Sequence, residues 1–346
     1  MQVNSSERLR ADQVSGVQTV VEAATRSDGV APLSEQVLLT LRGDASGSVH
    51  FLAYDGTHLA GYAHLERGLA GDGGTGENGE AATGEVVVDP ESRRQGVGTA
   101  LINALEDALT SPPDSVAEQP DPTVPQRDSA ILQMWSHGHL DAAAALLTGR
   151  GYAKTRDLWS MSRPLGPDAA ELPDAAELPE ARLPEGFTSR HFVVGQDEDA
   201  WLGVNARAFV DHPEQGRMTR LDLDARIAQP WFDETGLILI EDLRGPTPVL
   251  AASHWTKVVP AADPEVSPTE GEVYVVGVDP AYQGLGLGRA VTVLGLAHLL
   301  GRGLSGATLY VDADNAAAVA TYARLGFTHT GSDVMYARVV HRPVSG

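Results

Sequence analysis

The chain carries the same strand-turn-helix pattern twice, and this repeat constrains its fold more than any other feature. The first copy reads EVVVDPESRRQGVGTA from Glu85, and the second reads EVYVVGVDPAYQGLGLGRA from Glu272. Each copy runs from a Val-rich strand through Asp-Pro and a glycine-rich turn into an apolar helix. Because the surrounding segments repeat as well, the pattern predicts a duplicated domain rather than a solenoid of short repeats.

The elements around the two copies follow the same order in each half. Two helices are expected first, at residues 11–25 and 32–41 and again at 198–210 and 223–229. Two strands, the repeated motif, another strand, a short helix and a last strand follow, judged from apolar and β-branched runs bounded by Gly, Pro and Asp. This order predicts an α+β fold with two tandem domains, each a mixed, mostly antiparallel sheet flanked by helices.

A proline-rich stretch separates the two halves. PDAAELPDAAELPEARLPEG, from Pro167, repeats DAAELP and has the composition of a semi-rigid spacer. It predicts an N-terminal domain at 1–165, a linker at 166–186 and a C-terminal domain at 187–346. The N-terminus offers no convincing first strand, so the first domain is expected to be trimmed there. The glycine-rich segment 68–84 is expected to be a long loop in that domain.

The charge balance excludes two classes of partner. Asp and Glu number 47 against 25 Lys and Arg, which gives a formal net charge of −22. Such a field repels phosphates, so neither nucleic acid nor an anionic membrane is expected as a partner. A phosphate-bearing ligand must therefore be held locally, by backbone amides or by a few arginines.

The residue types also argue against metals and export. The chain has no cysteine, which excludes disulfides and thiolate metal ligands. Asp211, His212 and Glu214 resemble a metal cluster, but Pro213 interrupts them, so no metal is expected. The N-terminus lacks an apolar signal segment, and no apolar run approaches the ~18 residues of a membrane span. We expect a cytoplasmic protein that acts on a small molecule and is monomeric, because its tandem copies can pair within one chain.

The glycine-rich turns have a chemistry of their own. Gly286 and Gly288 let backbone N–H groups approach a ligand closely, and the helix that follows adds the unpaired amides of its first turn. Such a site suits a pyrophosphate. Glycine-rich turns are also common without any ligand, so a simple turn is the alternative at this point.

Motifs on either side of the turn resemble those of the Gcn5-related N-acetyltransferase (GNAT) family. The family motif Arg/Gln-x-x-Gly-x-Gly matches at Gln283-x-x-Gly286-x-Gly288 and again from Arg93. In the second half, NAAAVATYARLGF from Asn315 is similar to the later family motif, in which a Tyr follows the Asn and precedes Gly-Phe. The resemblance covers nearly the whole chain, once per half, and implies acetyl-CoA as co-substrate.

The resemblance also implies where the cofactor lies. The pyrophosphate is expected on the loop amides and the pantetheine arm on the Val-rich strand, where family members splay the sheet, often with a bulge. The implied cofactor residues of the first half are Val86, Val87, Val88, Arg94, Gln95, Gly96, Val97, Gly98 and Thr99. Those of the second half are Val276, Gly277, Val278, Gln283, Gly284, Leu285, Gly286, Leu287, Gly288, Arg289, Asn315, Ala316, Ala317, Ala318, Val319 and Ala320.

The two copies differ where the chemistry needs polar groups. Aligning the glycine-rich turns places Glu272 over Ala82, and aligning the Gly-aromatic turns places Tyr322 over Leu147, while Asn315 also falls on a leucine. Acetyl transfer needs a base to deprotonate the amine and an acid for the departing thiolate. In the family, residues at the places of Glu272 and Tyr322 fill these roles. The second half is therefore expected to be catalytic, and the first a degenerate copy.

A narrower resemblance is to tandem members of the family that acetylate the cysteinyl amine of a cysteine–glucosamine–inositol conjugate. It rests on the stretches AFVDHPEQG, SHWTKV, TLYVDADN and LSEQVL. It implies substrate contacts by Glu35, Glu214, Lys257, Glu272 and Tyr310. Carboxylates can accept hydrogen bonds from hydroxyls or attract an ammonium, and a lysine can donate to hydroxyls or to a carbonyl.

Other interpretations stay open on the sequence alone. Glu272 can be a solvated strand-edge charge, Tyr322 a core aromatic and Lys257 a surface residue. The chain can also be an N-acetyltransferase for another small amine or a peptide, or an acetyl-CoA-binding regulatory protein without turnover. The DHPEQG loop favours the narrower resemblance, and retention of Glu272 with Tyr322 argues against a protein without turnover.

Overall fold

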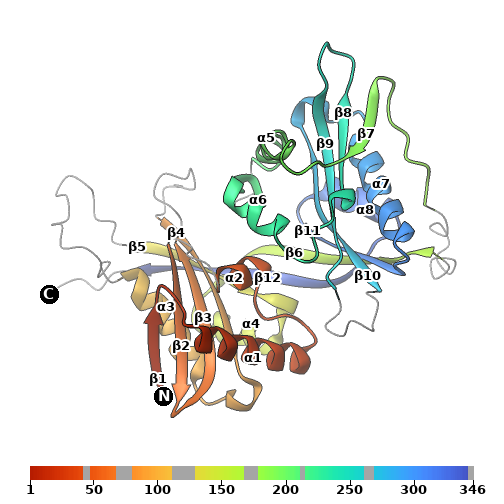
Figure 1. The fold of residues 1–346 in the computed structure, drawn as a ribbon. Helices are drawn as coiled ribbons and strands as arrows, with labels where there is room; N and C mark the ends of the chain where they lie inside the picture. Colours follow the sequence, from red (N-terminus) through yellow and green to blue (C-terminus); the bar gives the residue numbers. More distant parts are fainter. Residues whose placement is uncertain are drawn as a thin grey trace, which may run out of the picture. The chain divides into compact units, whose positions relative to one another are not determined.

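The structure is a computed structural model that describes residues 1–41, 47–67, 80–110, 129–166, 178–210, 215–260 and 269–341. The chain forms two compact units (Figure 1). One unit holds Met1–Asp157 together with Ser332–Gly346, and the other holds Leu158–Gly331.

The first unit is a mixed sheet with the strand order β1-β2-β3-β4-β5-β12. Neighbouring strands are antiparallel except for β4 and β5, which run parallel. Its elements are β1 (Gln2–Ser6), α1 (Ala11–Asp28), α2 (Glu35–Thr40), β2 (Ser48–Asp55), β3 (His58–Arg67), β4 (Glu80–Val88), α3 (Val97–Thr110), β5 (Ser129–Ser136), α4 (Asp141–Gly149) and the C-terminal part of β12 (Thr328–His341).

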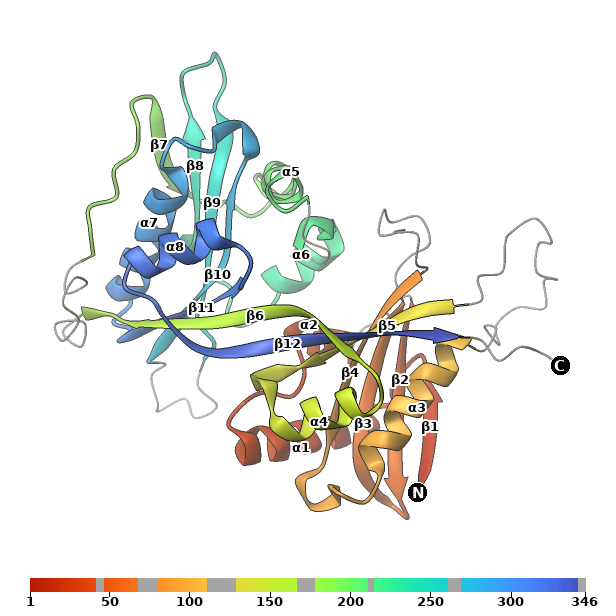
Figure 2. The same cartoon turned by 180° about the vertical axis from the view of Figure 1, so that it is seen from behind.

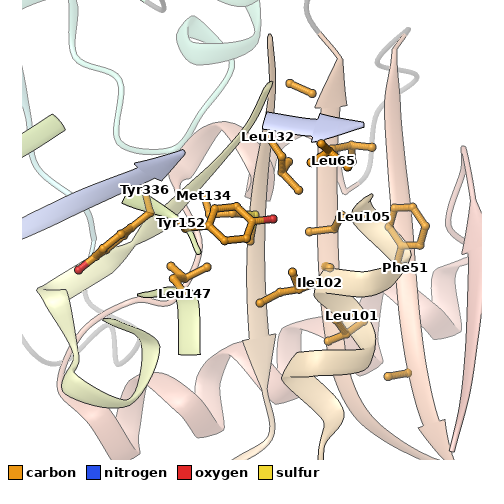
Figure 3. Close-up of a cluster of buried hydrophobic side chains, with 14 of the residues drawn as sticks. Phe51, Leu65, Leu101, Ile102, Leu105, Leu132, Met134, Leu147, Tyr152 and Tyr336 are labelled. Carbon is orange, nitrogen blue, oxygen red and sulfur yellow. The ribbon is translucent and has the colours of Figure 1, made fainter. Parts of the chain in front are cut away.

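Helices cover both faces of this sheet because its strands alternate apolar side chains between the faces. Leu52 and Tyr62 pack with the apolar residues of α1 and α2. Leu101 of α3 packs in the core of the opposite face together with Tyr152 and with Tyr336 of β12 (Figure 3). The result is a three-layer arrangement in which each layer buries the apolar side of its neighbour.

The second unit repeats this design with the strand order β6-β11-β10-β9-β8-β7. Here β10 and β11 are the parallel pair, and the other described pairings are antiparallel. Its elements are most of β6 (Ala153–Pro164), β7 (Phe187–His191), α5 (Glu198–Ala208), α6 (Arg220–Ile227), β8 (Leu237–Asp242), β9 (Val249–Lys257), β10 (Glu270–Val278), α7 (Leu287–Gly301), β11 (Gly306–Asp312) and α8 (Ala316–Arg324).

Two apolar cores lie on opposite faces of the second sheet. Trp201 of α5 and Leu223 of α6 pack on one face around Trp255. Leu296 of α7 packs on the other face in a core that Tyr322 of α8 joins. The expected α+β fold, two domains with mixed sheets flanked by helices, is therefore confirmed.

The last strand of each half completes the sheet of the other unit (Figure 2). β6 follows α4, but its residues Leu158–Pro164 pair with β11. β12 ends the described chain, but its residues Val334–His341 pair with β5, and Tyr336 lies in the core of the first unit. The compact units therefore differ from a division of the chain at residues 166–186, because each half contributes one strand to the other.

Two expectations about ends and loops are wrong. The polar stretch Gln2–Ser6 forms β1, an edge strand that pairs with β2. Residues 80–84, expected to continue a loop, begin β4 and pair with β5. In both places the pairing with a neighbouring strand, rather than local propensity, decides the structure.

The predicted spacer is only partly described. Residues 167–177 lie outside the described part of the chain, as do residues 68–79 of the predicted loop. Leu178, in the second DAAELP copy, and Leu183, which follows it, pack against apolar cores of the second unit. The described end of the spacer is therefore attached to the folded unit.

Helix α7 approaches β9 so closely that one of its positions must be glycine. His254 of β9 is fully buried, and its Nδ1 donates a hydrogen bond to the Val291 carbonyl at 2.9 Å. Burial lowers the pKa of His254 to about 4, so the ring is neutral at pH 7. A Cβ at Gly295 would overlap this ring.

We predict that Gly295→Ala lowers the free energy of unfolding by about 2 kcal/mol or more, because the methyl group forces α7 away from the His254 ring. Gly301→Ala in the same helix is the control, since no atom of the described residues lies within 4 Å of a Cβ there. Urea unfolding followed by circular dichroism measures both variants. Equal stability of the two would contradict the close packing of α7 on β9.

Candidate active site

The parallel strands of each unit separate before they end. β10 continues to its last residues after its pairing with β11 stops at Val273, and β4 continues after its pairing with β5 stops at Gly84. Beyond these points the facing backbone groups of the two strands no longer bond to each other, which suits an extended ligand with amide groups of its own. Residues 86–88 and 276–278, predicted to bind the cofactor, form the separated ends.

β10 has one residue more than β4 at the point of separation. Against β9, Glu272 pairs with Lys257 and Val275 pairs with Trp255, so Tyr274 is a bulge residue. β4 pairs with β3 without any shift in register. The bulge that the family resemblance implies is therefore present in the second half and absent from the described β3–β4 pair. Bulges of this kind redirect side chains beside functional sites.

The bulge corrects the alignment of the two halves. When the two halves are aligned at their glycine-rich turns and compared strand by strand, Lys257 of β9 corresponds to Glu66 of β3. Glu66 pairs with Thr83, just as Lys257 pairs with Glu272. Thr83, rather than Ala82, therefore stands where Glu272 stands, and the sequence alignment is wrong by the one bulge residue. The first half still lacks a carboxylate at this place, because threonine has none.

The glycine-rich turns have the open geometry of an anion site. Gly284 and Gly286 have φ angles of +80° and +78°, and no atom of the described residues lies within 4 Å of a Cβ at either position. The first copy matches them with Arg94 at +63° and Gly96 at +85°. Helices α7 and α3 begin directly after these turns. The unpaired N–H groups of their first turns therefore lie beside open space.

Glu272 lies beside a buried cation that aromatic rings hold in place. Lys257 is 9% exposed, and its Nζ lies 5.0 Å from the centre of the Trp231 ring and 4.8 Å from that of Tyr274. Arg226 Nε donates a hydrogen bond to the Tyr274 hydroxyl at 2.8 Å. Cross-strand partners share one face of a sheet, so Glu272 and Lys257 both lie on the face that α5 and α6 cover. The alternative of a surface lysine is thus wrong.

Tyr322 of α8 lies on the opposite face of the sheet. Asn315 caps this helix, because its Oδ1 accepts a hydrogen bond from Ala318 N at 3.1 Å. The Tyr322 ring meets the Phe327 ring edge-on, with centres 5.8 Å apart, and it packs on the same core as Val276. Burial raises the pKa of Tyr322 to about 12. The phenol therefore keeps its proton at neutral pH and can donate it.

The corresponding helix of the first half lacks both polar groups. Leu140 takes the place of Asn315 before α4 and provides no side-chain cap. Leu147 takes the place of Tyr322, and Tyr152 N donates to the Leu147 carbonyl at 3.1 Å, as in the equivalent bond after α8. The alignment of these two positions therefore agrees with the structure.

The other predicted substrate contacts lie on separate elements. Tyr310 of β11 is 52% exposed. Glu35 is the first residue of α2, in the first unit. Glu214 belongs to the segment 211–214, which lies outside the described residues together with the metal-like cluster of the sequence. The lysine and the glutamate on β9 and β10 are direct neighbours, whereas these three residues are not part of that pair.

The first unit carries a buried charge network where its own strands separate. Glu85 of β4 is 4% exposed and accepts a hydrogen bond from Ser34 N at 2.6 Å. His137 Nε2 lies 3.4 Å from Glu85 Oε2, and its Nδ1 lies 2.9 Å from Asp333 Oδ2 of β12. Gly138 N donates to Asp333 at 2.7 Å. Sequence reasoning missed this network because its members come from four distant segments.

The network keeps Glu85 from acting as a base. Burial alone would raise the pKa of the Glu85 carboxyl, but hydrogen bonds from His137 and Ser34 lower it. Burial alone would lower the pKa of His137, but hydrogen bonds to Asp333 and Glu85 raise it to about 10. An ionised carboxylate bonded to a protonated histidine is poorly suited to take a proton from an amine.

The described ranges contain neither a metal-binding group nor a candidate membrane-spanning helix. No group of three or more His, Asp or Glu side chains in them is arranged to hold a metal ion. No helix in the same ranges is long and apolar enough to cross a membrane.

Comparison with models of known families matches both halves of the chain. The sequence model of the Acetyltransferase (GNAT) family matches residues 19–112 and 209–327, more than half of the chain. Each match includes one glycine-rich turn. The duplication read from the sequence is therefore a duplication of this family's domain.

Individual proteins are similar over nearly the whole chain. A mycothiol acetyltransferase from Thermomonospora curvata is 47% identical over 96% of this chain and 95% of its own length. One from Catenulispora acidiphila is 46% identical over 93% of this chain and 94% of its own. Among solved structures, a tandem GNAT protein from the clavulanic acid biosynthesis pathway superposes with a TM-score of 0.66 at 15% identity, covering 99% of this chain and 100% of that one. The structural likeness shows the fold alone.

We predict that His137→Gln destabilises the protein in a pH-dependent way. The folded pKa of about 10 lies above the ordinary value of 6.5. The ion pairs therefore stabilise the fold fully below about pH 6.5, and this stabilisation is lost as the pH rises through about 10. At pH 6 the variant should lose about 3 kcal/mol of unfolding free energy, and its difference from the unchanged protein should shrink toward pH 10.

Urea denaturation at several pH values measures this difference. His341→Gln, at the exposed end of β12, is the matched control and should follow the unchanged protein throughout. A His137→Gln deficit that stays constant with pH would mean that the histidine stabilises the unit as a neutral ring.

Proposed function

This chain belongs to the Acetyltransferase (GNAT) family, and on that premise we propose that it is the N-acetyltransferase of the last step of mycothiol biosynthesis. The proposed acceptor is the cysteinyl amine of a cysteine–glucosamine–inositol conjugate, and the donor is acetyl-CoA. The observation that carries the proposal is the 47% identity to a mycothiol acetyltransferase over nearly the full length of both chains.

The second unit has a place that fits acetyl-CoA. Gly284 and Gly286 leave open space at the N-terminus of α7, where backbone amides can hold the pyrophosphate. We propose that residues 283–289 bind it, that 276–278 pair with the pantetheine amides, and that 315–320 of α8 and its cap line the arm. Acetyl-CoA supplies the acetyl group as a thioester.

Glu272 is the proposed general base. The amine must lose a proton before its nitrogen attacks the thioester carbon, and a carboxylate can take that proton directly or through a water. Glu272 lies just before the strand separation, opposite Lys257. As the C–N bond forms, the carbonyl oxygen gains negative charge, which it gives back when the C–S bond breaks and the thiolate leaves. Backbone N–H groups of the separated strand, residues 276–278, can stabilise that charge.

Tyr322 is the proposed general acid. Its phenol is protonated at neutral pH, so it can donate a hydrogen bond to the departing thiolate and pass on the proton as the C–S bond breaks. Glu272 and Tyr322 lie on opposite faces of the sheet. The base can therefore approach the amine from one side, and the acid can approach the sulfur from the other.

We propose that the first unit does not catalyse acetyl transfer. It retains a glycine-rich turn, at residues 94–99, and a separated strand end, at 86–88, and can hold acetyl-CoA there. Thr83 and Leu147 replace the base and the acid, and Glu85 is bonded to His137. Its role is then structural or in shaping the acceptor site.

The acceptor contacts are proposed from the resemblance. Glu35, Glu214, Lys257 and Tyr310 are the proposed partners of its hydroxyls, carbonyl and ammonium, together with the base. The enzyme is proposed to act as a monomer in the cytoplasm on small molecules, without nucleic acid or membrane. The net charge of −22 supports this choice of partners.

A substrate panel tests the function. The purified protein is given acetyl-CoA with the cysteinyl conjugate, an aminoglycoside or a short peptide, and thiol release is followed. Turnover should be fastest with the cysteinyl conjugate. Faster turnover of another amine would replace the proposed acceptor, and acetyl-CoA binding without any turnover would favour a regulatory protein.

We predict that Glu272→Gln and Tyr322→Phe each lower kcat about 100-fold or more, because each removes one proton transfer while keeping the shape of the side chain. Glu270→Gln, two residues earlier on the same strand, should leave kcat within about twofold. Activity that survives both changes would show that the base and the acid are other residues.

Matched substitutions in the two glycine-rich turns test whether the second half alone is catalytic. Gly286→Val and Gly96→Val place a side chain at φ angles of +78° and +85°, in equally open surroundings. Both should therefore lose a similar stability, about 1 kcal/mol or more. Activity should fall much further for Gly286→Val, because only that turn serves the reacting acetyl group. Equal losses of kcat would contradict a catalytic second half.

A further inference from the structure

One buried carboxylate anchors the start of the glycine-rich turn in the second unit. Asp279 follows β10 and is 6% exposed. Its Oδ1 accepts a hydrogen bond from Ala281 N at 2.9 Å, and its carbonyl accepts one from Tyr282 N at 2.8 Å. Its own N–H donates to the Ala251 carbonyl at 2.9 Å. These bonds fix the first residues of the turn to the sheet.

A negative charge at this point opposes an anionic ligand, and a nearby arginine cancels it. Arg207 Nε lies 2.8 Å and its Nη2 lies 2.7 Å from Asp279 Oδ2. The arginine side chain is 56% exposed, whereas that of the carboxylate is 9% exposed. Without the arginine, a buried carboxylate would stay uncompensated at the start of the turn. The arginine's position there, in a chain of net charge −22, is where its charge bears most on an anionic ligand.

The same turn of α5 also contacts two other parts of the site. Asn205 and Gln215 exchange two hydrogen bonds, of 2.6 and 2.9 Å, so the fifth residue of the DHPEQG stretch is tied to the helix. A Cβ at Gly277 on the separated strand would lie 3.4 Å from the Phe209 ring. The end of α5 therefore lies beside the separated strand, bonds to Gln215 and, through Arg207, contacts the start of the glycine-rich turn.

The first unit treats the equivalent carboxylate differently. Asp89 follows β4 and accepts a hydrogen bond from Glu91 N at 3.0 Å. Its ionic partner is His58, whose Nε2 lies 3.0 Å away. Arg93 of the turn is held by Asp28 at 2.7 Å. The carboxylate of the second unit thus pairs with an arginine from α5, whereas that of the first unit lies beside a histidine of β3.

We propose that Arg207 is a positioning residue for the CoA thioester: it neutralises Asp279 and ties the glycine-rich turn to the end of α5. The inference rests on the proposed use of acetyl-CoA by the second unit and on no particular acceptor. Because Arg207 acts through Asp279, its loss weakens donor binding rather than the chemical step.

Isothermal titration with acetyl-CoA alone tests the proposal. Arg207→Gln should weaken binding at one site about tenfold, because it exposes the pyrophosphate to an uncompensated carboxylate. Adding Asp279→Asn should restore most of the affinity, since the amide keeps the acceptor for Ala281 N and removes the charge. Arg207→Lys should retain part of the affinity, because lysine keeps the charge but not the two-point contact.

Arg220→Gln on α6 is the matched control. Its side chain is 48% exposed, and its Nε lies 2.8 Å from Asp224 of the same helix rather than from a residue of the turn, so acetyl-CoA affinity should not change. With saturating acetyl-CoA, kcat of Arg207→Gln should stay within about twofold. Unchanged affinity in Arg207→Gln, or no recovery in the double variant, would overturn the proposal. Binding is measured without an acceptor, so a failed acceptor assignment leaves this result readable.

Discussion

Backbone N–H and C=O groups need hydrogen-bond partners. In both sheets the two parallel strands stop bonding to each other before they end. The separated ends of β10 and β4 present strand edges inside a folded unit. Such an edge can pair with an amide-bearing ligand in the way it would pair with an added strand. The other parts of the site follow from this separation: the glycine-rich turn lies at the end of the strand, and helices on either face can bring side chains to it.

The two halves differ in the charged side chains that lie where the parallel strands separate. In the second half, the bulge residue Tyr274 packs on Lys257, beside Glu272, and leaves the carboxylate in register with a buried cation. In the first half, Glu85 and His137 satisfy each other's charges. The two halves thus share one strand order but differ at this point both in the backbone, through the bulge, and in the charged groups beside it.

The sequence was sufficient for whatever depends on local pattern. The duplicated motif, the order of helices and strands around it, and the leucine that stands in the first half where the second has Tyr322 all follow from spacing. It was insufficient where distant segments decide. The bulge at Tyr274 moved the counterpart of Glu272 by one residue, β1 owes its strand to β2, and the partners of His137 and Arg207 come from elements far away in the chain.

The exchange of β6 and β12 bears on whether either half of the chain could be lost during evolution. Each half supplies the last strand to the sheet of the other unit, so deleting one half would leave the other one strand short. A half that lost its chemistry would then be retained for its architecture, and mutation would be free to erode its catalytic groups but not its sheet.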